Sequence, residues 1–148
     1  ETFYDFIIID CPPGMSRLSL NALVACDELL IPLKPETGSV FGAHFISNVV
    51  TQTLQANPEL RVLGILPTMF DERWKKSATD VLEQLDQLIP GALLNTKIHR
   101  TLSAADAVNE GLPVVKSKPS DTVAGEYRDL ADEIIYSRRP GAKKQKSR

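Results

Sequence analysis

An aspartate that directly follows an apolar run is the residue of this chain best suited to chemistry. The run ends at Ile9, Asp10 follows it, and a Cys-Pro-Pro-Gly turn comes next. An uninterrupted apolar strand is typical of a parallel sheet that is covered on both faces. Asp10 would then lie at the carboxyl end of a strand, at the edge where α/β proteins bind their ligands.

Two interpretations of Asp10 fit these residues equally well. In P-loop nucleotide hydrolases an aspartate so placed is the Walker B residue, which helps to hold the magnesium of a bound nucleotide. Alternatively, Asp10 is a solvated residue that begins a turn after a buried strand. The phosphate-binding motif G-x-x-x-x-G-K-[ST] does not occur in the 148 residues,. Under the first interpretation we expect a chain that opens with Glu1 to be the carboxyl-terminal part of a longer protein.

Strand-like and helix-like segments alternate along the rest of the chain. Short apolar runs predict strands at 27–33, 61–70, 93–98 and 114–115,. Apolar residues at helical spacing predict helices over 37–56, 74–89, 101–109 and 120–137,. This alternation predicts an α/β fold, with a mostly parallel twisted sheet and helices on both faces.

Composition and charge exclude some classes of protein. No apolar run approaches the roughly 20 residues of a membrane helix. Cys11 and Cys26 lack metal-type spacing and accompany only two histidines, so free thiols in a reducing cytosol are expected,. Six of the 17 basic residues, and none of the 19 acidic ones, lie after Ser137. This tail is expected to be disordered, and it would either attract polyanions or serve only as a solubilising terminus.

Four segments in order resemble the ParA/MinD family of P-loop ATPases with a deviant Walker A motif, most closely its ParA (Soj-like) partition branch. They are Ile7–Gly14, Leu20–Glu36, Leu63–Asp71, and Ile98–Arg100 taken with Gly111–Val114. The resemblance covers residues 3 to 137. It implies a P-loop NTPase-like fold that is incomplete at the amino terminus, with 1–137 as the carboxyl-terminal part of the ATPase domain and 138–148 as a basic disordered tail.

The resemblance implies that the intact protein binds ATP and Mg²⁺ and hydrolyses ATP. Asp10 would be the catalytic and metal residue, acting through a magnesium-bound water, and Pro12 to Gly14 would sense the γ-phosphate. Thr68 and the His99-Arg100 pair would flank the adenine. From the residues alone, Thr68 is equally an ordinary strand-end hydroxyl and His99 a surface imidazole. The phosphate-gripping lysines would lie upstream, so this chain alone is expected to be inactive.

The resemblance also implies DNA binding. Arg73, Lys75, Lys76 and Arg100 would contact phosphates without sequence preference. A solvated helix start is the alternative for the first three. Two departures from the family pattern bear on these roles: His99 replaces a proline beside the adenine, and Ser103 replaces a second arginine linked to DNA binding.

The family further implies a cytoplasmic, nucleoid-associated protein of chromosome or plasmid partition. ATP would join two copies into a homodimer on nonspecific DNA, and a ParB-like partner would stimulate hydrolysis. A MinD-like membrane-associated ATPase is an alternative, although Pro140-Gly141 breaks the tail and no apolar face suits a membrane surface,. A non-catalytic adaptor scaffold is another. A relative of the nitrogenase iron protein would need Cys11 and Cys26 as cluster ligands.

Overall fold

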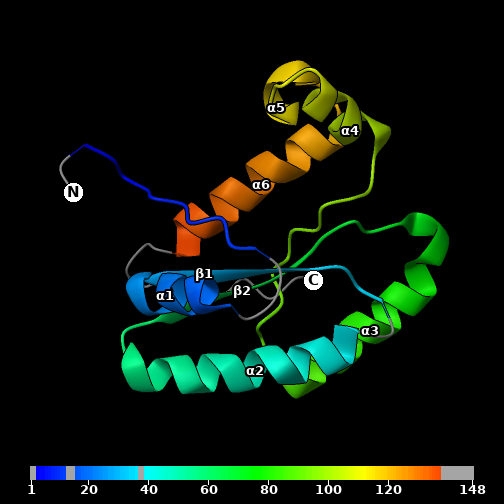
Figure 1. Ribbon diagram of the computed structural model, residues 1–148. Coiled ribbons are helices and arrows are strands. Elements are labelled where there is room, and N and C mark those ends of the chain that lie inside the picture. Colours follow the sequence, from blue (N-terminus) through cyan, green and yellow to red (C-terminus); the bar gives the residue numbers. More distant parts are fainter. Residues whose placement is uncertain (1–2, 13–15, 37–38, 138–148) are drawn as a thin grey trace.

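The computed structural model describes residues 3–12, 16–36 and 39–137 (Figure 1). The predicted switch residues Pro13 and Gly14 and the predicted tail 138–148 lie outside the described residues. The helices are α1 (Arg17–Ala25), α2 (Ser39–Ala56), α3 (Lys75–Leu88), α4 (Leu102–Asn109), α5 (Val114–Ser117) and α6 (Thr122–Ser137), with a 3-10 turn, η1 (Glu72–Trp74), before α3. The strands are β1 (Glu28–Leu33) and β2 (Arg61–Pro67).

The two strands pair in parallel, as predicted, and α2 forms the connection between them. Ile31 lies opposite Ile65, and the register shifts next to Leu30, which lies opposite Gly64. Gly64 has φ +152°, and a Cβ atom there would lie 2.7 Å from the carbonyl oxygen of Ala92. Only glycine therefore allows the chain at residue 92 to approach β2 this closely.

Helices cover both faces of the sheet, which confirms the predicted α/β arrangement (Figure 1). On one face Ile31 and Ile65 pack against α3 through Leu85, which is fully buried. On the other face Leu66 packs with Val123 and with other apolar residues of α4, α5 and α6. The alternation of side chains along each strand produces these two cores.

The predicted strand at 93–98 forms only in part. Leu93 makes an isolated parallel bridge to Ile65 of β2, and His99 makes another to Phe70, just beyond β2. Between the bridges the backbone turns to α6, because the N–H groups of Asn95 and Thr96 donate to the Glu133 carboxylate at 2.9 and 3.0 Å. We call residues 92–100 the third segment.

The opening residues correct one prediction, since none of the described residues before Asp10 lies in a strand. Residues 3–12 are extended, but they form no ladder with any part of the chain that the structure describes. Ile7 is 78% exposed and Ile8 is 90% exposed. A strand of this apolar composition is stable only when neighbouring strands and both faces cover it. Within the described residues β1 pairs with β2 alone, so the opening segment has no such neighbour.

A second prediction was wrong at residues 114–115, where a helical turn replaces a strand. Pro113 has an extended backbone and acts as the N-cap of α5. The N–H groups of Lys116 and Ser117 donate to its carbonyl oxygen at 2.8 and 3.0 Å. A proline ahead of the first turn favours this start, since its missing N–H is not needed there.

Two observations bear on the expectations from composition. Cys11 and Cys26 are free thiols. None of the described helices combines the length and the apolar character that crossing a membrane requires.

The Glu133 carboxylate provides a test of how α6 holds the third segment. It accepts hydrogen bonds from the backbone and side chains of Asn95 and Thr96. Burial alone would raise the pKa of Glu133, but these hydrogen bonds outweigh burial and lower it. Glu133→Gln should therefore reduce the free energy of unfolding by about 1–3 kcal/mol at neutral pH, measured by urea denaturation.

The same interaction has a predictable dependence on pH. Because the folded-state pKa of Glu133 lies below the ordinary glutamate value of 4.5, this stabilisation is present above that pH and is lost as the pH falls below it,. Asp132→Asn removes the same charge from an exposed neighbour on α6 and is the control. Equal stability of the two variants at neutral pH would contradict the assignment.

Candidate functional site

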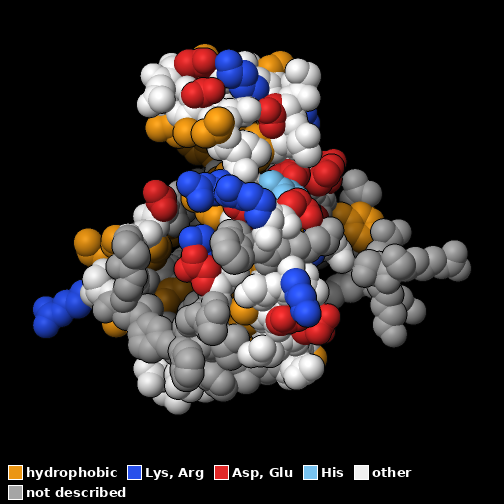
Figure 2. Space-filling model, turned by 90° about the vertical axis from the view of Figure 1, so that its right-hand side faces the viewer, with side chains coloured by type: hydrophobic (Ala, Val, Ile, Leu, Met, Phe, Trp, Pro, Cys, Tyr) orange, Lys and Arg blue, Asp and Glu red, His pale blue; other side chains and the backbone are white. Residues whose placement is uncertain are grey.

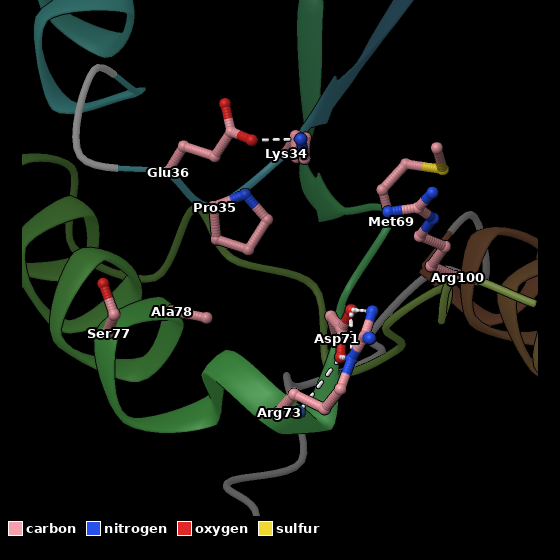
Figure 3. Close-up of a pocket in the computed structure, with 9 residues that line it drawn as sticks. All are labelled: Lys34, Pro35, Glu36, Met69, Asp71, Arg73, Ser77, Ala78 and Arg100. Carbon is pink, nitrogen blue, oxygen red and sulfur yellow. Dashed lines mark hydrogen bonds and ion pairs between the residues drawn. The ribbon is translucent and has the colours of Figure 1, made fainter.

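A pocket of about 290 Å³ opens at the carboxyl ends of β1 and β2 (Figure 3). Ligands of open α/β sheets bind at this edge. We call it the edge pocket. Its lining comes from the residues after β1, the residues after β2, the start of α3 and the end of the third segment, namely Lys34, Pro35, Glu36, Met69, Asp71, Arg73, Ser77, Ala78 and Arg100.

An arginine and an aspartate two residues apart form the pocket's strongest interaction. The Arg73 Nε atom donates to both Asp71 carboxylate oxygens at 2.9 and 3.1 Å, and Nη2 donates to Oδ2 at 2.5 Å (Figure 3). The backbone N–H of Arg73 also donates to Asp71 Oδ1 at 3.0 Å. The Arg73 side chain and backbone hydrogen bonds lower the pKa of Asp71 to about 2. The Asp71 carboxylate thus both caps η1 and forms an ion pair with the Arg73 guanidinium.

Arg100 brings a second guanidinium to the edge pocket. Its backbone N–H donates to the Phe70 carbonyl at 2.9 Å, which attaches it to the chain just beyond β2. Its positive charge adds to the lowering of the Asp71 pKa. In Figure 3 its side chain lies beside Met69. Among the described residues no hydrogen bond or ion pair engages the Arg100 side chain, so its guanidinium is available to a ligand.

The other charged residues of the pocket form a pair. Lys34 and Glu36 make an ion pair just beyond β1 (Figure 3).

Met69 has φ 53°, a left-handed conformation that is uncommon for a residue with a side chain,. Such backbone strain is often found at functional sites, and here it occurs at the turn that leads from β2 to Asp71.

His99 does not line the edge pocket. Its Nδ1 atom lies 2.5 Å from Glu126 Oε1, and its Nε2 atom lies 3.3 Å from Glu72 Oε1. Its backbone N–H donates to Glu126 Oε2 at 2.8 Å, and its ring meets Phe70 edge-on at 5.2 Å. Figure 2 shows one face of the molecule on which Asp and Glu side chains lie close to Lys and Arg side chains. His99 is therefore a link between α6 and η1, and the structure does not bring it together with Arg100 in one pocket.

The predicted nucleotide residues near the start of the chain are not assembled with the edge pocket. Asp10 and Pro12 are exposed on the opening segment and are not among the pocket's lining residues. Thr68 directly follows β2, as expected, and its backbone N–H donates to the Leu33 carbonyl at 2.9 Å. It extends the strand pairing by one residue and does not line the pocket.

The predicted DNA-binding residues divide into two groups. Arg73 and Arg100 both line the edge pocket. Lys76 is exposed on the first turn of α3, outside the lining, and the side chain of Lys75 is not among the described ones. Ser103, where the family pattern has a second arginine, donates from its hydroxyl to Asp121 Oδ2 at 2.5 Å and so joins α4 to the start of α6.

The described residues fit an anion better than a metal ion. Within the part of the chain that the structure describes, no group of three or more His, Cys, Asp or Glu side chains could hold a metal. A magnesium ion bound through Asp10 would need further ligands, because Mg²⁺ keeps waters and binds substrate phosphates. The guanidinium groups of Arg73 and Arg100, by contrast, match phosphate and carboxylate oxygens in geometry and charge.

Sequence reasoning missed three features of this region. The roles of Glu126 and Glu133 depend on contacts between α6 and the third segment, which are distant in sequence. The positive φ of Met69 has no signal in its residue type. The Asp71–Arg73 pair did have a signal in the sequence, since an aspartate ahead of a helix often accepts a hydrogen bond from the backbone N–H two residues later.

Comparisons with known proteins agree with the fold. A family model described as an AAA domain matches residues 1–62. The chromosome-partitioning ATPase Soj of Treponema pallidum is 35% identical over 133 residues, which cover 89% of this chain and 52% of that protein. A ParA family protein of Chlamydia trachomatis is 32% identical over 136 residues, covering 92% of this chain and 52% of that protein. The chain therefore spans about half the length of the curated relatives it matches.

A solved structure extends the comparison. The structure of cobyrinic acid a,c-diamide synthase from Mycobacterium smegmatis with a bound ATP analog and magnesium superposes with a TM-score of 0.76 at 29% identity, covering 93% of this chain and 50% of that one. The fold agrees with this similarity to Soj and ParA proteins, since its strands are parallel and helices cover both faces of the sheet. Over about half of their length, this chain is similar to ParA family proteins, among them the chromosome-partitioning ATPase Soj.

Proposed function

We propose that this chain is part of a ParA-type ATPase of chromosome or plasmid partition that binds nonspecific DNA through the edge pocket. In this proposal ATP joins two copies into a homodimer on nucleoid DNA in the cytoplasm, and a ParB-like partner stimulates hydrolysis. The observation that carries the DNA-binding part is the convergence of Arg73 and Arg100 on one pocket at the carboxyl edge of the sheet. Paired guanidinium groups on an open surface suit the phosphates of a nucleic acid backbone.

The nucleotide part of the proposal is supported by the relatives. One relative is named a chromosome-partitioning ATPase, and the synthase structure holds an ATP analog and magnesium. In this chain Asp10 is the residue proposed to act on the magnesium through a water molecule. Pro12, Thr68, His99 and Arg100 are the residues proposed to lie near the nucleotide. The described residues do not assemble a magnesium site by themselves.

The 148-residue chain by itself should neither bind ATP tightly nor hydrolyse it. It contains no G-x-x-x-x-G-K-[ST] loop, whose backbone amides and lysine hold the phosphates,. Isothermal titration calorimetry with Mg²⁺·ATP should give no resolved heat of binding at micromolar concentrations, and phosphate release should match a protein-free blank. Micromolar binding would contradict this expectation.

Arg100→Gln should weaken binding of a random-sequence DNA duplex. Loss of one phosphate contact should lower the affinity several-fold at low salt and reduce the slope of log K against log salt by about one. Fluorescence anisotropy at several salt concentrations measures both quantities.

Arg61→Gln is the matched control for this experiment. It removes the same charge at the amino end of β2, opposite the edge pocket, where Arg61 pairs with Glu28. If the two variants bind DNA equally well, the edge pocket is not the DNA-binding surface.

A further inference from the structure

The Asp71 carboxylate occupies the position that a phosphate would take in the proposed DNA-binding site. It accepts from three side-chain contacts of Arg73 and lies close enough to Arg100 to feel its charge. We propose that Asp71 is an internal competitor of nucleic acid phosphate for the Nε–Nη2 edge of the Arg73 guanidinium. This inference rests on the proposed function, and it assigns to the same site a built-in limit on affinity.

The geometry of the pair supports competition, because carboxylate and phosphate use the same donors. The Arg73 guanidinium presents its N–H groups in a planar fork that fits two oxygens of either anion. Nε and Nη2 both already donate to Asp71. A phosphate oxygen cannot share these short contacts, so a phosphate that takes this edge of the guanidinium exchanges one anion for the other, whereas the Nη1 N–H groups do not donate to Asp71,.

The exposure of the two partners indicates that the exchange can occur. The Arg73 side chain is 76% exposed, whereas that of Asp71 is 19% exposed. A ligand arriving from solvent therefore meets the guanidinium first. Exposed ion pairs are weak, since water competes with them and salt screens them. The pair can consequently hold Arg73 in the absence of DNA without preventing its release.

The backbone keeps the Asp71 carboxylate in the pocket after release. Its Oδ1 atom also accepts from the Arg73 backbone N–H at 3.0 Å, an interaction that does not depend on the guanidinium. A released carboxylate would therefore remain beside Arg100 and beside the incoming phosphate. Asp71 should oppose DNA binding in two ways, by occupying Arg73 and by repelling the phosphate that replaces it.

Asp71→Asn tests the proposal with little structural change. Asparagine keeps an oxygen that can accept from the Arg73 N–H, but it loses the negative charge. The variant of this chain should bind random-sequence duplex DNA about two- to fivefold more tightly than the unaltered chain at moderate salt, as expected for removal of an exposed ion pair. The slope of log K against log salt should become steeper, because Arg73 then binds phosphate without freeing a carboxylate.

Three further variants make the result decisive. Asp132→Asn removes the same negative charge from α6 and should leave DNA affinity unchanged. A gain in DNA affinity equal to that of Asp71→Asn would mean that only net charge matters. Arg73→Gln should weaken binding, and the double variant Asp71→Asn/Arg73→Gln should lose most of the gain of Asp71→Asn. If Arg73→Gln has no effect, or if neither the unaltered chain nor Asp71→Asn binds DNA at low salt, the proposed DNA-binding site fails. If Arg73→Gln weakens binding but Asp71→Asn does not strengthen it, only the competition is overturned.

The pair can also be tested without DNA, through its titration. The folded pKa of Asp71 is about 2, below the ordinary aspartate value of 3.8, so the pair contributes stability above about pH 3.8 and loses it as the pH falls toward 2,. NMR titration of the Asp71 side-chain carboxyl carbon should give this low pKa, and Arg73→Gln should move it toward 3.8. An unchanged pKa in Arg73→Gln would show that Arg73 does not hold the carboxylate and would overturn the competition.

Discussion

The parallel pairing of β1 with β2 is the constraint on which the rest of this structure depends. Because both strands run in the same direction, the residues that follow them emerge at one edge of the sheet,. The third segment also runs parallel to β2, so Arg100 arrives at that edge as well. Lys34, Asp71 and Arg100 are far apart in the sequence and share a pocket only for this reason.

Helix α6 secures this arrangement through two carboxylates. Glu133 binds the backbone of Asn95 and Thr96, and Glu126 binds the backbone and ring of His99. The spacing of seven residues places both carboxylates on one side of the helix. The third segment is thus held by β2 on one side and by α6 on the other. The position of Arg100 therefore depends on a helix that contributes nothing to the lining of the pocket.

The sequence predicted the parts of the fold that depend on local pattern. The two buried strands and the four helices that it predicted are present, because their apolar periodicity and end signals are strong,. It failed where neighbours decide the structure. Residues 6–9 were predicted to form a strand but join no ladder among the described residues, and Val114-Val115 were predicted to form a strand but follow a proline that starts a helical turn. Of the candidate site residues, Arg73 and Arg100 share a pocket, whereas no local pattern indicated that the ring of His99 would be enclosed by two glutamates from different helical elements.

The close approach at Gly64 has a consequence for the tolerance of this protein to mutation. A methyl group at that position would meet the Ala92 carbonyl oxygen and would force the backbone beyond it away from the sheet. Eight residues later that backbone carries a guanidinium into the pocket. Replacement of a small residue in the interior of a strand would thus disturb ligand recognition at a distance, and variation at this position should be as restricted as at any group that touches the ligand.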